Sequence, residues 1–488
     1  MNSLFRNLKG RLAAALTSGA LFYFVFGLKP YWLAAWLAPI PLLLAAFHAG
    51  GREARVLAWL ASAIGFTSVI TYYGKTTGPL AAVILIVLQM LMWGFIIGRT
   101  RAAVVCSSHW LTLFVYPVIL AAADTLVAFF SPHGTAGSMV FGQMGFLPVV
   151  QIASVLGAPA IVFLVSLFAS TVAIAIYRGR GISRPLLGYG LAAAILLSAL
   201  GWGAFRLRVT APGPWVKVGL VSVDDYVGAG VPASRVRAVW AAYDQAVRKL
   251  AAEGALIVVL PEKIFELAPN ETSKCMVKCE WLARDAGVYL VVGVQLDQPG
   301  RKRNVSWLFS NAGMLLAEYD KQHMVPHLES DLTPGHEDII STIEREPYGL
   351  AICRDMFFTH LTRAYSQKGV SALLIPGWDF YVDAWWASRV AAMRGVEGGY
   401  SVVRAGRESY LAVSDQFGRI LAEKRSDFLP GASLLAVLPL GPATPTLYAR
   451  FGDVFGWFCV AGAVLAIVSS RHPRRIDTEA PPRRHMAI

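Results

Sequence analysis

Charged residues are scarce in this chain. Of its 488 residues, only 15% are Asp, Glu, Lys or Arg, whereas 56% are hydrophobic, and its mean hydropathy is +0.52. Globular domains carry about 25% charged residues, so this composition excludes an ordinary soluble protein and indicates several membrane spans. Acidic residues are the scarcer kind, 31 against 44 basic ones. No nucleic-acid-binding motif accompanies the positive excess, and we expect no nucleic acid partner.

Cysteine is also scarce. Five cysteines are few for an exported domain, which would use them in disulfides. Cys275 and Cys279 stand four apart in an expected helix, 272–286, where a disulfide within one turn would be strained. Without nearby Cys or His partners they are a weak metal signal as well, and we interpret both as ordinary helix residues. Two others lie at or in apolar runs, so Cys353 is left without a partner, as a catalytic thiol requires.

Long apolar runs are what the chain has in abundance. A membrane-spanning helix needs about 20 apolar residues, and we interpret eight runs as spans. The runs lie at about 11–28, 31–48, 56–73, 79–98, 109–130, 148–177, 186–205 and 450–470. The first lacks a small-residue cleavage site, so we expect an anchor rather than a removed signal peptide. This predicts a bundle of about seven helices over 1–205, a C-terminal membrane helix over 449–470 and a basic tail over 471–488.

Loop charges orient these spans. With the N-terminus in the cytoplasm, the inner loops and the tail hold most of the Lys and Arg of the membrane segments, whereas the short outer loops hold only Lys29 and Lys75. Because cytoplasmic loops favour basic residues, we expect both termini in the cytoplasm and the polar segment 206–448 outside it.

Segment 206–448 alternates between strand-like and helical runs. Strand-like runs such as Leu256–Leu260 and Leu315–Tyr319 alternate with helical stretches such as Ser234–Glu253 and Ala384–Glu397. This order predicts a layered α/β domain with one core, attached to the helical membrane bundle.

Three reactive side chains stand where expected strands end. Glu262, Lys321 and Cys353 each follow or end an apolar run, and strand ends are where α/β sheets usually carry chemistry. A free thiol has a pKa of about 8.5 and needs a neighbouring base or cation to react at neutral pH. We expect Glu262 to take the thiol proton and later that of an attacking amine. We expect Lys321 and the backbone N–H of Arg354 to stabilise an oxyanion.

Two carboxylates are expected to support these groups. Glu329 is expected to orient Lys321 or the nucleophile, and Asp355 to hold a neighbouring loop in place. A metal site is the alternative for part of this region, because His323 and His327 stand four apart and could share a metal on a helix together with Glu329. Pro326 interrupts any helix there, which argues against a metallohydrolase.

These motifs resemble those of the carbon–nitrogen hydrolase (nitrilase) superfamily, and in particular those of the apolipoprotein N-acyltransferase family. Members of that family join an N-terminal membrane bundle, a nitrilase-like domain and a final transmembrane helix, so the resemblance covers nearly the whole chain. The matching stretches are Leu260-Pro261-Glu262, Tyr319-Asp320-Lys321 followed by Val325-Pro326 and Glu329, Cys353-Arg354-Asp355, and Arg394 with Glu397.

The resemblance implies a nitrilase-like αββα sandwich for segment 206–448 and a Glu262-Lys321-Cys353 triad. It implies a two-step, ping-pong reaction in which Cys353 takes a fatty acyl chain from a phospholipid as a thioester. The chain then passes to the α-amino group of a diacylglyceryl-cysteine apolipoprotein. We therefore expect a monomeric multi-pass protein of the bacterial inner membrane with a periplasmic catalytic domain, and neither a metal nor an organic cofactor.

Several positions depart from the family pattern. Arg354 stands where an aromatic residue usually follows the catalytic Cys, and Asp355 replaces Glu. These changes lie beside the expected pocket and leave the acyl donor and acceptor open. Apolar and aromatic residues near the motifs are candidates for a lid over an acyl chain. These candidates are Ile264, Phe265, Trp378, Phe380 and Tyr381.

Other functions compete with this interpretation. A membrane-anchored amidase of the same superfamily would hand the acyl group to water, and the triad alone does not distinguish it from a transferase, or from a transferase acting on a different amine. A non-catalytic transporter or scaffold would carry paired charges inside its spans. Asp124 is nearly the only acidic residue deep in a span, so we favour the acyltransferase.

Overall fold

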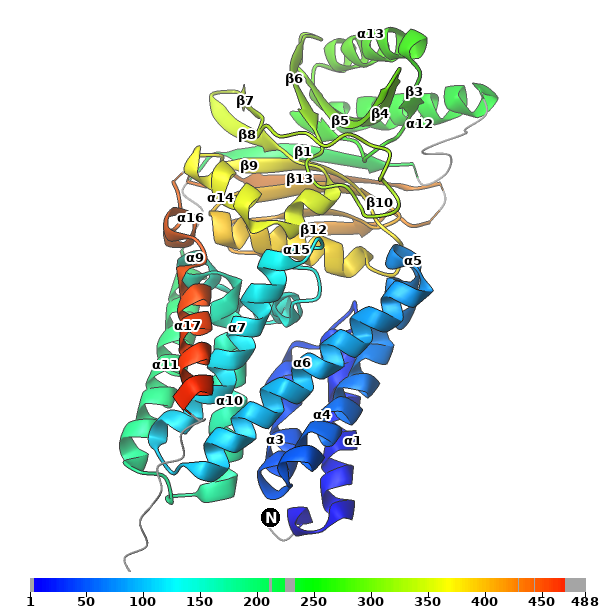
Figure 1. Cartoon of the computed structure of the whole chain (residues 1–488). Coiled ribbons are helices and arrows are strands. Elements are labelled where there is room, and N and C mark those ends of the chain that lie inside the picture. Colours follow the sequence, from blue (N-terminus) through cyan, green and yellow to red (C-terminus); the bar gives the residue numbers. More distant parts are fainter. Residues whose placement is uncertain (1–3, 210–212, 224–232, 429, 443, 470–488) are drawn as a thin grey trace, which may run out of the picture.

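The structure is a computed structural model that describes residues 4–209, 213–223, 233–428, 430–442 and 444–469 (Figure 1). The predicted basic tail, 471–488, lies outside these residues. Figure 1 shows a bundle of helices at the bottom and a layered α/β domain at the top. Both ends of the chain contribute to the bundle, because the last helix, α17 (Val454–Ser469), packs beside α7 (Val115–Phe130).

Helices make up the bundle, with short 3-10 turns between them. The helices are α1 (Leu8–Phe26), α2 (Trp32–Leu37), α3 (Pro39–His48), α4 (Gly51–Phe66), α5 (Ile70–Thr77), α6 (Pro79–Cys106), α7, α8 (Leu147–Val150), α9 (Ala153–Leu156), α10 (Ala158–Arg178), α11 (Pro185–Arg206), α16 (Leu447–Phe451) and α17. The 3-10 turns are η1 (Leu4–Arg6), η2 (Thr67–Val69), η3 (Trp110–Phe114) and η4 (Met139–Gly145).

The predicted apolar runs coincide with these helices. Among the described residues, five helical segments are long and apolar enough to cross a membrane. They are Gly51–Thr77, Pro79–Cys106, Trp110–Phe130, Ala158–Arg178 and Pro185–Arg206. The other three runs form α1, the α2–α3 pair and α17.

The long run 148–177 is divided by a glycine. Gly157 follows α9 and has a φ of +76°, a conformation that glycine adopts without strain, and α10 begins at the next residue. A Cβ at Gly157 would lie 2.4 Å from the ring of Tyr448 on α16. Gly157 therefore both ends the short helix and admits the segment that returns from the α/β domain to the bundle.

Two mixed sheets form the centre of the α/β domain. The first sheet has the order β13 (Ala432–Pro439), β1 (Trp215–Ser222), β2 (Ile257–Val259), β4 (Tyr289–Gln298), β5 (Arg301–Phe309) and β6 (Leu315–Asp320), with β3 (Glu266–Leu267) beside β4. The second has the order β12 (Ile420–Arg425), β11 (Tyr410–Ser414), β10 (Ser401–Arg407), β9 (Ala372–Trp378), β8 (Glu346–Leu350) and β7 (Ile340–Ile343).

Helices cover the outer face of each sheet. The helices α12 (Ala233–Ala252) and α13 (Pro269–Ala286) cover the first sheet, and α14 (Thr359–Gln367) and α15 (Ala384–Gly398) cover the second (Figure 1). The first half of strand β4, residues 290–294, is apolar because both of its faces are buried. Val292 packs with the α12–α13 side, whereas Val291 packs between the sheets, since successive strand residues point to opposite faces. The layers are those of an αββα sandwich, which confirms the predicted fold class.

Helix α15 joins the α/β domain to the bundle. Nearly all of its residues are buried, because one side packs on the second sheet and the other on η4 and α9. Trp386 on this helix contacts the ring of Phe141 in η4, with ring centroids 5.6 Å apart, and the ring of Tyr72 in α5 at 6.5 Å. The second sheet and its helices therefore face the bundle, and the first sheet faces away from it.

Candidate active site

Glu262 lies on the loop that follows β2, and this loop is held against β4. The Ile264 N–H donates to the Gly293 carbonyl oxygen at 2.9 Å. A Cβ at Gly293 would lie 2.7 Å from the Cα atom of Glu262, so the loop comes this close only because that residue is glycine. The Glu262 side chain is consequently buried, at 2% exposed, beyond the ends of the parallel strands β2 and β4.

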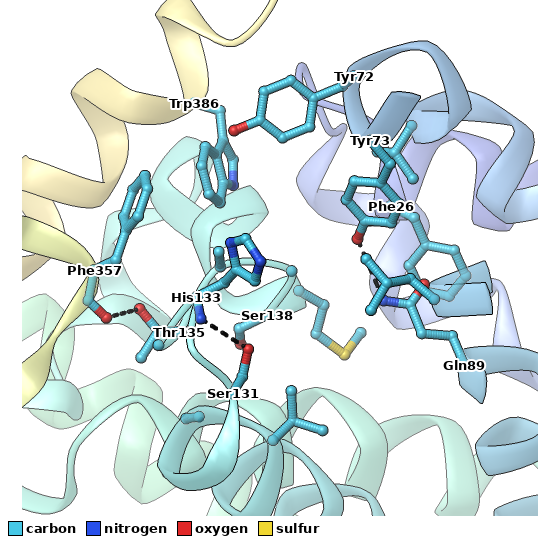
Figure 2. Close-up of a pocket in the computed structure, with 18 of the residues that line it drawn as sticks. Phe26, Tyr72, Tyr73, Gln89, Ser131, His133, Thr135, Ser138, Phe357 and Trp386 are labelled. Carbon is cyan, nitrogen blue, oxygen red and sulfur yellow. Dashed lines mark hydrogen bonds between the residues drawn. The ribbon is translucent and has the colours of Figure 1, made fainter. Parts of the chain in front are cut away.

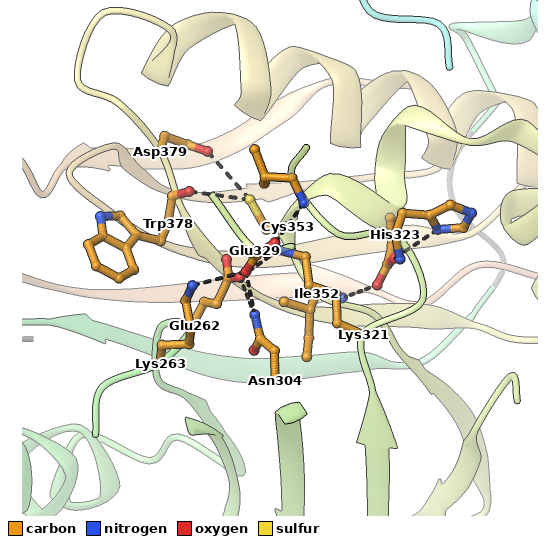
Figure 3. Close-up of polar contacts among 12 residues, drawn as sticks. Glu262, Lys263, Asn304, Lys321, His323, Glu329, Ile352, Cys353, Trp378 and Asp379 are labelled. Atoms are coloured by element: carbon orange, nitrogen blue, oxygen red, sulfur yellow. Dashed lines mark hydrogen bonds and ion pairs between the residues drawn. The ribbon is translucent and has the colours of Figure 1, made fainter. Parts of the chain in front are cut away.

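Lys321 lies between two carboxylates (Figure 3). Its Nζ donates to Glu262 Oε1 at 2.8 Å and to Glu329 Oε2 at 2.7 Å. Asn304 on β5 donates from Nδ2 to the same two carboxylates, at 2.7 Å and 3.0 Å. Lys263 donates to Glu329 Oε1 at 2.9 Å. Two carboxylates and two lysines thus balance in charge, which reduces the free energy needed to bury them.

Opposite charges fix the protonation states of this cluster. Burial alone would lower the pKa of Lys321, but Glu262 and Glu329 raise it above its usual range. Burial alone would raise the pKa of Glu329, but Lys321 and Lys263 hold it below its usual range. Lys321 is therefore an ammonium and Glu329 a carboxylate at neutral pH. Within the described part of the chain, Glu262 Oε2 is buried with no hydrogen-bond partner, which leaves it free to accept a proton.

Cys353 occupies a sharp turn rather than the end of a strand. Strand β8 ends at Leu350, and Cys353 begins the 3-10 turn η5 (Cys353–Phe357) with a left-handed φ of 42°. A residue other than glycine adopts this conformation at a cost of about 1–3 kcal/mol, and such residues cluster at active sites. Its Sγ lies 3.4 Å from the Trp378 carbonyl oxygen and 3.8 Å from Asp379 Oδ1. The strand that the sequence predicts to end at Cys353 therefore ends three residues earlier, at Leu350.

The resting thiol is protonated. Burial raises the pKa of Cys353 well above its usual range, and the carboxylates of Glu262 and Asp379 raise it further. Lys321 and Arg404 oppose this effect without reversing it. A nucleophile in this environment needs a base that removes its proton as it attacks.

A second buried ion pair lies on the other side of the thiol. Arg404 Nη2 donates to Asp379 Oδ1 at 2.7 Å and lies 4.0 Å from Cys353 Sγ. The Ser409 hydroxyl donates to the other oxygen of Asp379 and accepts a hydrogen bond from Arg404 Nη1 at 3.1 Å. Gly377 makes room for this arrangement, because a Cβ there would lie 2.8 Å from the Arg404 guanidinium.

Asp355 ties the Lys321 loop to the Cys353 turn. Its Oδ2 accepts hydrogen bonds from the Tyr319 hydroxyl at 2.7 Å and from the Ile352 N–H at 3.0 Å. Its Oδ1 accepts from the His323 N–H at 2.9 Å and contacts the His323 Nδ1 at 2.9 Å. Because Tyr319 and His323 lie on either side of Lys321 in the sequence, this carboxylate sets the position of the lysine relative to the thiol.

Arg354 connects the Cys353 turn to a loop of the bundle. The loop, residues 131–138, follows α7. Arg354 Nη2 donates to the Pro132 carbonyl oxygen at 2.7 Å and to His133 Nδ1 at 3.2 Å. The Thr135 N–H and hydroxyl donate to the Phe357 carbonyl oxygen at 2.9 Å and 2.8 Å, as Figure 2 shows for the hydroxyl. The bundle therefore contacts the same short turn that carries the thiol.

A cavity of about 570 Å³ lies between the bundle and the α/β domain. Figure 2 shows its walls, to which α1, α5, α6 and the loop 131–138 contribute side chains. Most of the lining is apolar, as with Phe26 and Met92, whereas Cys353, Arg354 and Asp379 line it from the α/β domain. The cavity thus joins an apolar region among the helices to the polar cluster around the thiol.

The lid candidates lie in different places. Trp378 and Phe380 line the cavity, and Phe380 contacts Tyr72 of α5, with ring centroids 6.3 Å apart. Tyr381 is 47% exposed and lies outside the cavity wall. Ile264 and Phe265 belong to the core between the first sheet and its helices, so the structure contradicts their placement at a lid. The sequence did not separate them because core and lid residues are equally apolar.

The structure does not favour the metal alternative. No group of three or more His, Cys, Asp or Glu in the part of the chain that the structure describes could hold a metal ion. His323 Nδ1 contacts the Asp355 carboxylate, and the His323 ring stacks on Phe358, with ring centroids 3.7 Å apart. Glu329 accepts four hydrogen bonds, from Lys263, Asn304, Lys321 and the Val325 N–H.

Sequence reasoning missed four members of the site. Asn304 and Lys263 complete the carboxylate cluster, and Asp379 with Arg404 forms the ion pair beside the thiol. The signal for Arg404 was a charged side chain within an apolar strand, which costs free energy unless it is paired, whereas Asn304 follows three basic residues of β5 and carried no such signal. That pattern marks a buried polar residue but does not identify its partner.

Comparisons with known proteins agree with this architecture. Residues 18–171 match the family model "Apolipoprotein N-acyltransferase N-terminal domain", and residues 226–411 match "Carbon-nitrogen hydrolase". Apolipoprotein N-acyltransferase of Geobacter metallireducens is 26% identical, over 94% of this chain and 95% of its own length.

Other similar proteins cover half of this chain or less. Human omega-amidase NIT2 is 34% identical over 156 residues, which are 27% of this chain and 54% of the amidase. A solved amidase structure from Nesterenkonia sp. is 19% identical and covers 49% of this chain and 94% of its own, with a TM-score of 0.41. The relative from Geobacter metallireducens matches along both halves of this chain. The two family models and the full-length relative establish that the chain belongs to the apolipoprotein N-acyltransferase family, within the carbon–nitrogen hydrolase superfamily.

Proposed function

We propose that the protein is a membrane N-acyltransferase that moves a fatty acyl chain from a phospholipid, through a thioester on Cys353, to the amine of a diacylglyceryl-cysteine apolipoprotein. One observation carries the proposal. The thiol lies at the polar end of an apolar cavity that the membrane helices line, beside a buried carboxylate and a buried ammonium. The relative along the full chain is named for acyl transfer to apolipoprotein.

The first half-reaction forms the thioester. Glu262 takes the Sγ proton while the sulfur attacks the carbonyl carbon of the phospholipid ester. The carbonyl oxygen becomes an oxyanion, which the Lys321 ammonium stabilises. When the tetrahedral intermediate collapses, the carbon–oxygen ester bond breaks. The departing alkoxide takes the proton from Glu262 and leaves as a lysophospholipid.

The second half-reaction transfers the chain. The acceptor amine attacks the thioester carbonyl carbon, and Glu262 takes a proton from the nitrogen. Lys321 again stabilises the oxyanion. Collapse breaks the carbon–sulfur bond, the thiolate recovers the proton from Glu262, and the product is an amide. Because Lys321 is held as an ammonium by two carboxylates, it keeps its charge through both half-reactions.

The setting suits a substrate that enters from a membrane. The cavity reaches from Cys353 to apolar side chains of α6 and α7, such as Leu88 and Val127, which are exposed on the bundle surface. An acyl chain can therefore pass from the bilayer into the cavity without exposing its methylenes to water, which would be unfavourable by about 0.8 kcal/mol for each methylene. We place the protein in the bacterial cytoplasmic membrane, with both termini in the cytoplasm and the catalytic domain on the periplasmic side, in agreement with the loop charges.

Intact mass of the purified protein tests the proposal. Wild type incubated with phospholipid is expected to gain the mass of one acyl chain, and Cys353→Ala is expected to gain none. Cys106→Ala, which removes an exposed thiol far along the sequence, is the matched control and keeps the adduct. Failure of the wild type to acquire an adduct, or an equal adduct on Cys353→Ala, contradicts the thioester.

A second step separates transfer from hydrolysis. Addition of a diacylated lipopeptide to the acylated protein is expected to yield a triacylated peptide. Release of free fatty acid alone would identify an amidase-like hydrolase instead, in line with the omega-amidases to which part of this chain is similar.

A further inference from the structure

Arg354 is a buried cation on the cavity wall. Its side chain is 5% exposed and lines the cavity beside Cys353. Among the described residues it forms no ion pair, and its Nε is buried without a hydrogen-bond partner. Its hydrogen bonds go to neutral acceptors, the Pro132 carbonyl oxygen and His133 Nδ1. An arginine stays protonated in proteins, so a positive charge remains here without a countercharge in contact.

The carboxylates nearest to Arg354 in the sequence and beside the thiol, Asp355 and Asp379, are hydrogen-bonded to other groups. Asp355 accepts hydrogen bonds from Tyr319, Ile352 and the His323 loop. Asp379 is paired with Arg404. An unpaired buried charge is unfavourable by several kcal/mol. The site is therefore complementary to an anion that comes from the cavity.

His133 adds a second donor at the same place. Burial lowers the pKa of His133 to about 4, and Arg354 and His327 lower it as well, so the ring is neutral at pH 7. Because Nδ1 accepts from Arg354, the ring proton lies on Nε2, which makes that atom a donor. His133 also lines the cavity, and Figure 2 shows its ring among the lining side chains.

We propose that Arg354 and His133 bind the phosphodiester of the phospholipid donor and thereby position its ester at Cys353. This inference rests on the proposed function and names the group that recognises one of its substrates. Arginine suits the role because its planar guanidinium donates to two phosphate oxygens at once. Arg354 directly follows Cys353, and consecutive Cα atoms are about 3.8 Å apart, so a headgroup held there keeps the glycerol esters close to the thiol.

The same charge distinguishes the two substrates. The acceptor presents an amine, which is cationic until it loses a proton, and Arg354 repels it. The donor presents an anion, which Arg354 attracts. The site therefore favours the phospholipid in the first half-reaction, and the acceptor approaches once the lysophospholipid has left.

The test compares a donor that carries a phosphate headgroup with one that has the same esters and no headgroup. Full-length protein in detergent is acylated under single-turnover conditions from dipalmitoyl phosphatidylglycerol or from dipalmitoylglycerol, which carries the same esters without a phosphate. Arg354→Gln is expected to slow acylation from the phospholipid at least tenfold and acylation from the neutral lipid less than threefold. Arg354→Lys keeps the charge and is expected to recover part of the loss.

A control addresses the structural role of Arg354 in holding loop 131–138. Thr135→Val removes the hydroxyl that donates to the Phe357 carbonyl oxygen and leaves Arg354 in place. It is expected to change both donor rates by the same factor. If Arg354→Gln also slows both donors equally, or slows neither, Arg354 does not bind the phosphate and the inference is overturned.

Free inorganic phosphate is the other ligand that Arg354 and His133 could bind. Inorganic phosphate is added as a competitor to wild type and Arg354→Gln. If the variant loses phosphate inhibition but keeps its phospholipid rate, the site serves free phosphate and the lipid assignment fails. If wild type forms no adduct from either donor, the proposed function fails and the inference falls with it. If the adduct forms at equal rates in wild type and Arg354→Gln, the inference about Arg354 is overturned and the proposed function stands.

Discussion

Glu329→Gln is the substitution for which the structure makes the sharpest prediction. Glu329 is 3% exposed. Its Oε1 accepts from Lys263 and Asn304, and its Oε2 accepts from Lys321 and the Val325 N–H. A glutamine has one oxygen and one NH₂ group, so in either orientation its NH₂ faces two donors. The substitution therefore removes the negative charge and places the new NH₂ group against two other hydrogen-bond donors.

The expected loss follows from the two lysines that remain. Removing one partner of a buried ion pair destabilises a protein by about 3–5 kcal/mol, and Lys321 keeps only Glu262 as a counterion. For a domain of this size, each kcal/mol lowers the melting temperature by about 2–4 °C, so we expect a fall of about 10 °C. A misplacement of about 1 Å in a catalytic group can slow a reaction about 100-fold, and we expect acylation to slow by that order.

The assay pairs single-turnover acylation of Cys353 with thermal unfolding of the same preparation. Glu318→Gln is the matched control, because Glu318 is also an ion-paired glutamate of the first sheet but is 32% exposed. A partly exposed pair contributes less than a buried one, so this variant is expected to lose less stability than Glu329→Gln and to acylate at the wild-type rate. If Glu329→Gln acylates within threefold of wild type and melts at the same temperature, Glu329 does not hold Lys321 in place.

Three further substitutions test separate parts of the site. Gly293→Ala places a Cβ 2.7 Å from the Cα atom of Glu262 and is expected to displace that base and slow acylation at least tenfold. Asp379→Asn removes a carboxylate that raises the pKa of the Cys353 thiol, so the pH midpoint of Cys353 alkylation, followed by peptide mass, is expected to fall. Burial raises the pKa of Glu397 to about 7. In the folded protein the Glu397 carboxyl therefore keeps a proton that it releases above about pH 4.5 in the unfolded chain. Stability is lost as pH rises from about 4.5 towards 7, so wild type is expected to melt lower at about pH 8.5 than at about pH 5. Glu397→Gln leaves the buried Arg394 without its ion-pair partner but removes the titrating group, so its melting temperature is expected to depend less on pH than that of wild type.

Each of these tests has an outcome that contradicts it. Gly190→Ala, where an added Cβ meets no atom within 4 Å, controls for Gly293→Ala, and equal acylation by the two variants refutes the packing argument. An unchanged or higher alkylation midpoint in Asp379→Asn shows that this carboxylate does not act on the thiol. A difference in melting temperature that does not depend on pH shows that Glu397 does not titrate on unfolding.

Local patterns were enough to predict the architecture. The apolar runs coincide with helices, and the alternation of runs in 206–448 predicted the layered domain, because membrane spans and buried strands are recorded in consecutive residues. Glu262, Lys321 and Cys353 could be picked out because each stands beside an apolar run in a motif that resembles a known family. The strand end at Cys353 was misplaced, since a left-handed φ leaves no mark in hydrophobicity.

The partners of these residues were decided by the tertiary structure. Asn304 reaches both carboxylates because β5 lies between β4 and β6 in the sheet, and a polar residue within a strand does not name its partner. In the sequence, Arg354 was only a departure from a family pattern. Its contact with Pro132 spans 222 positions, and folding makes it a buried cation at the end of an apolar cavity. Hydrophobic periodicity acts over a few residues, whereas charge pairing and cavity walls depend on segments that meet only in the folded protein. The sequence by itself therefore determined the apolar helices, the layers and the candidate nucleophile, and the fold determined which charges meet around that thiol.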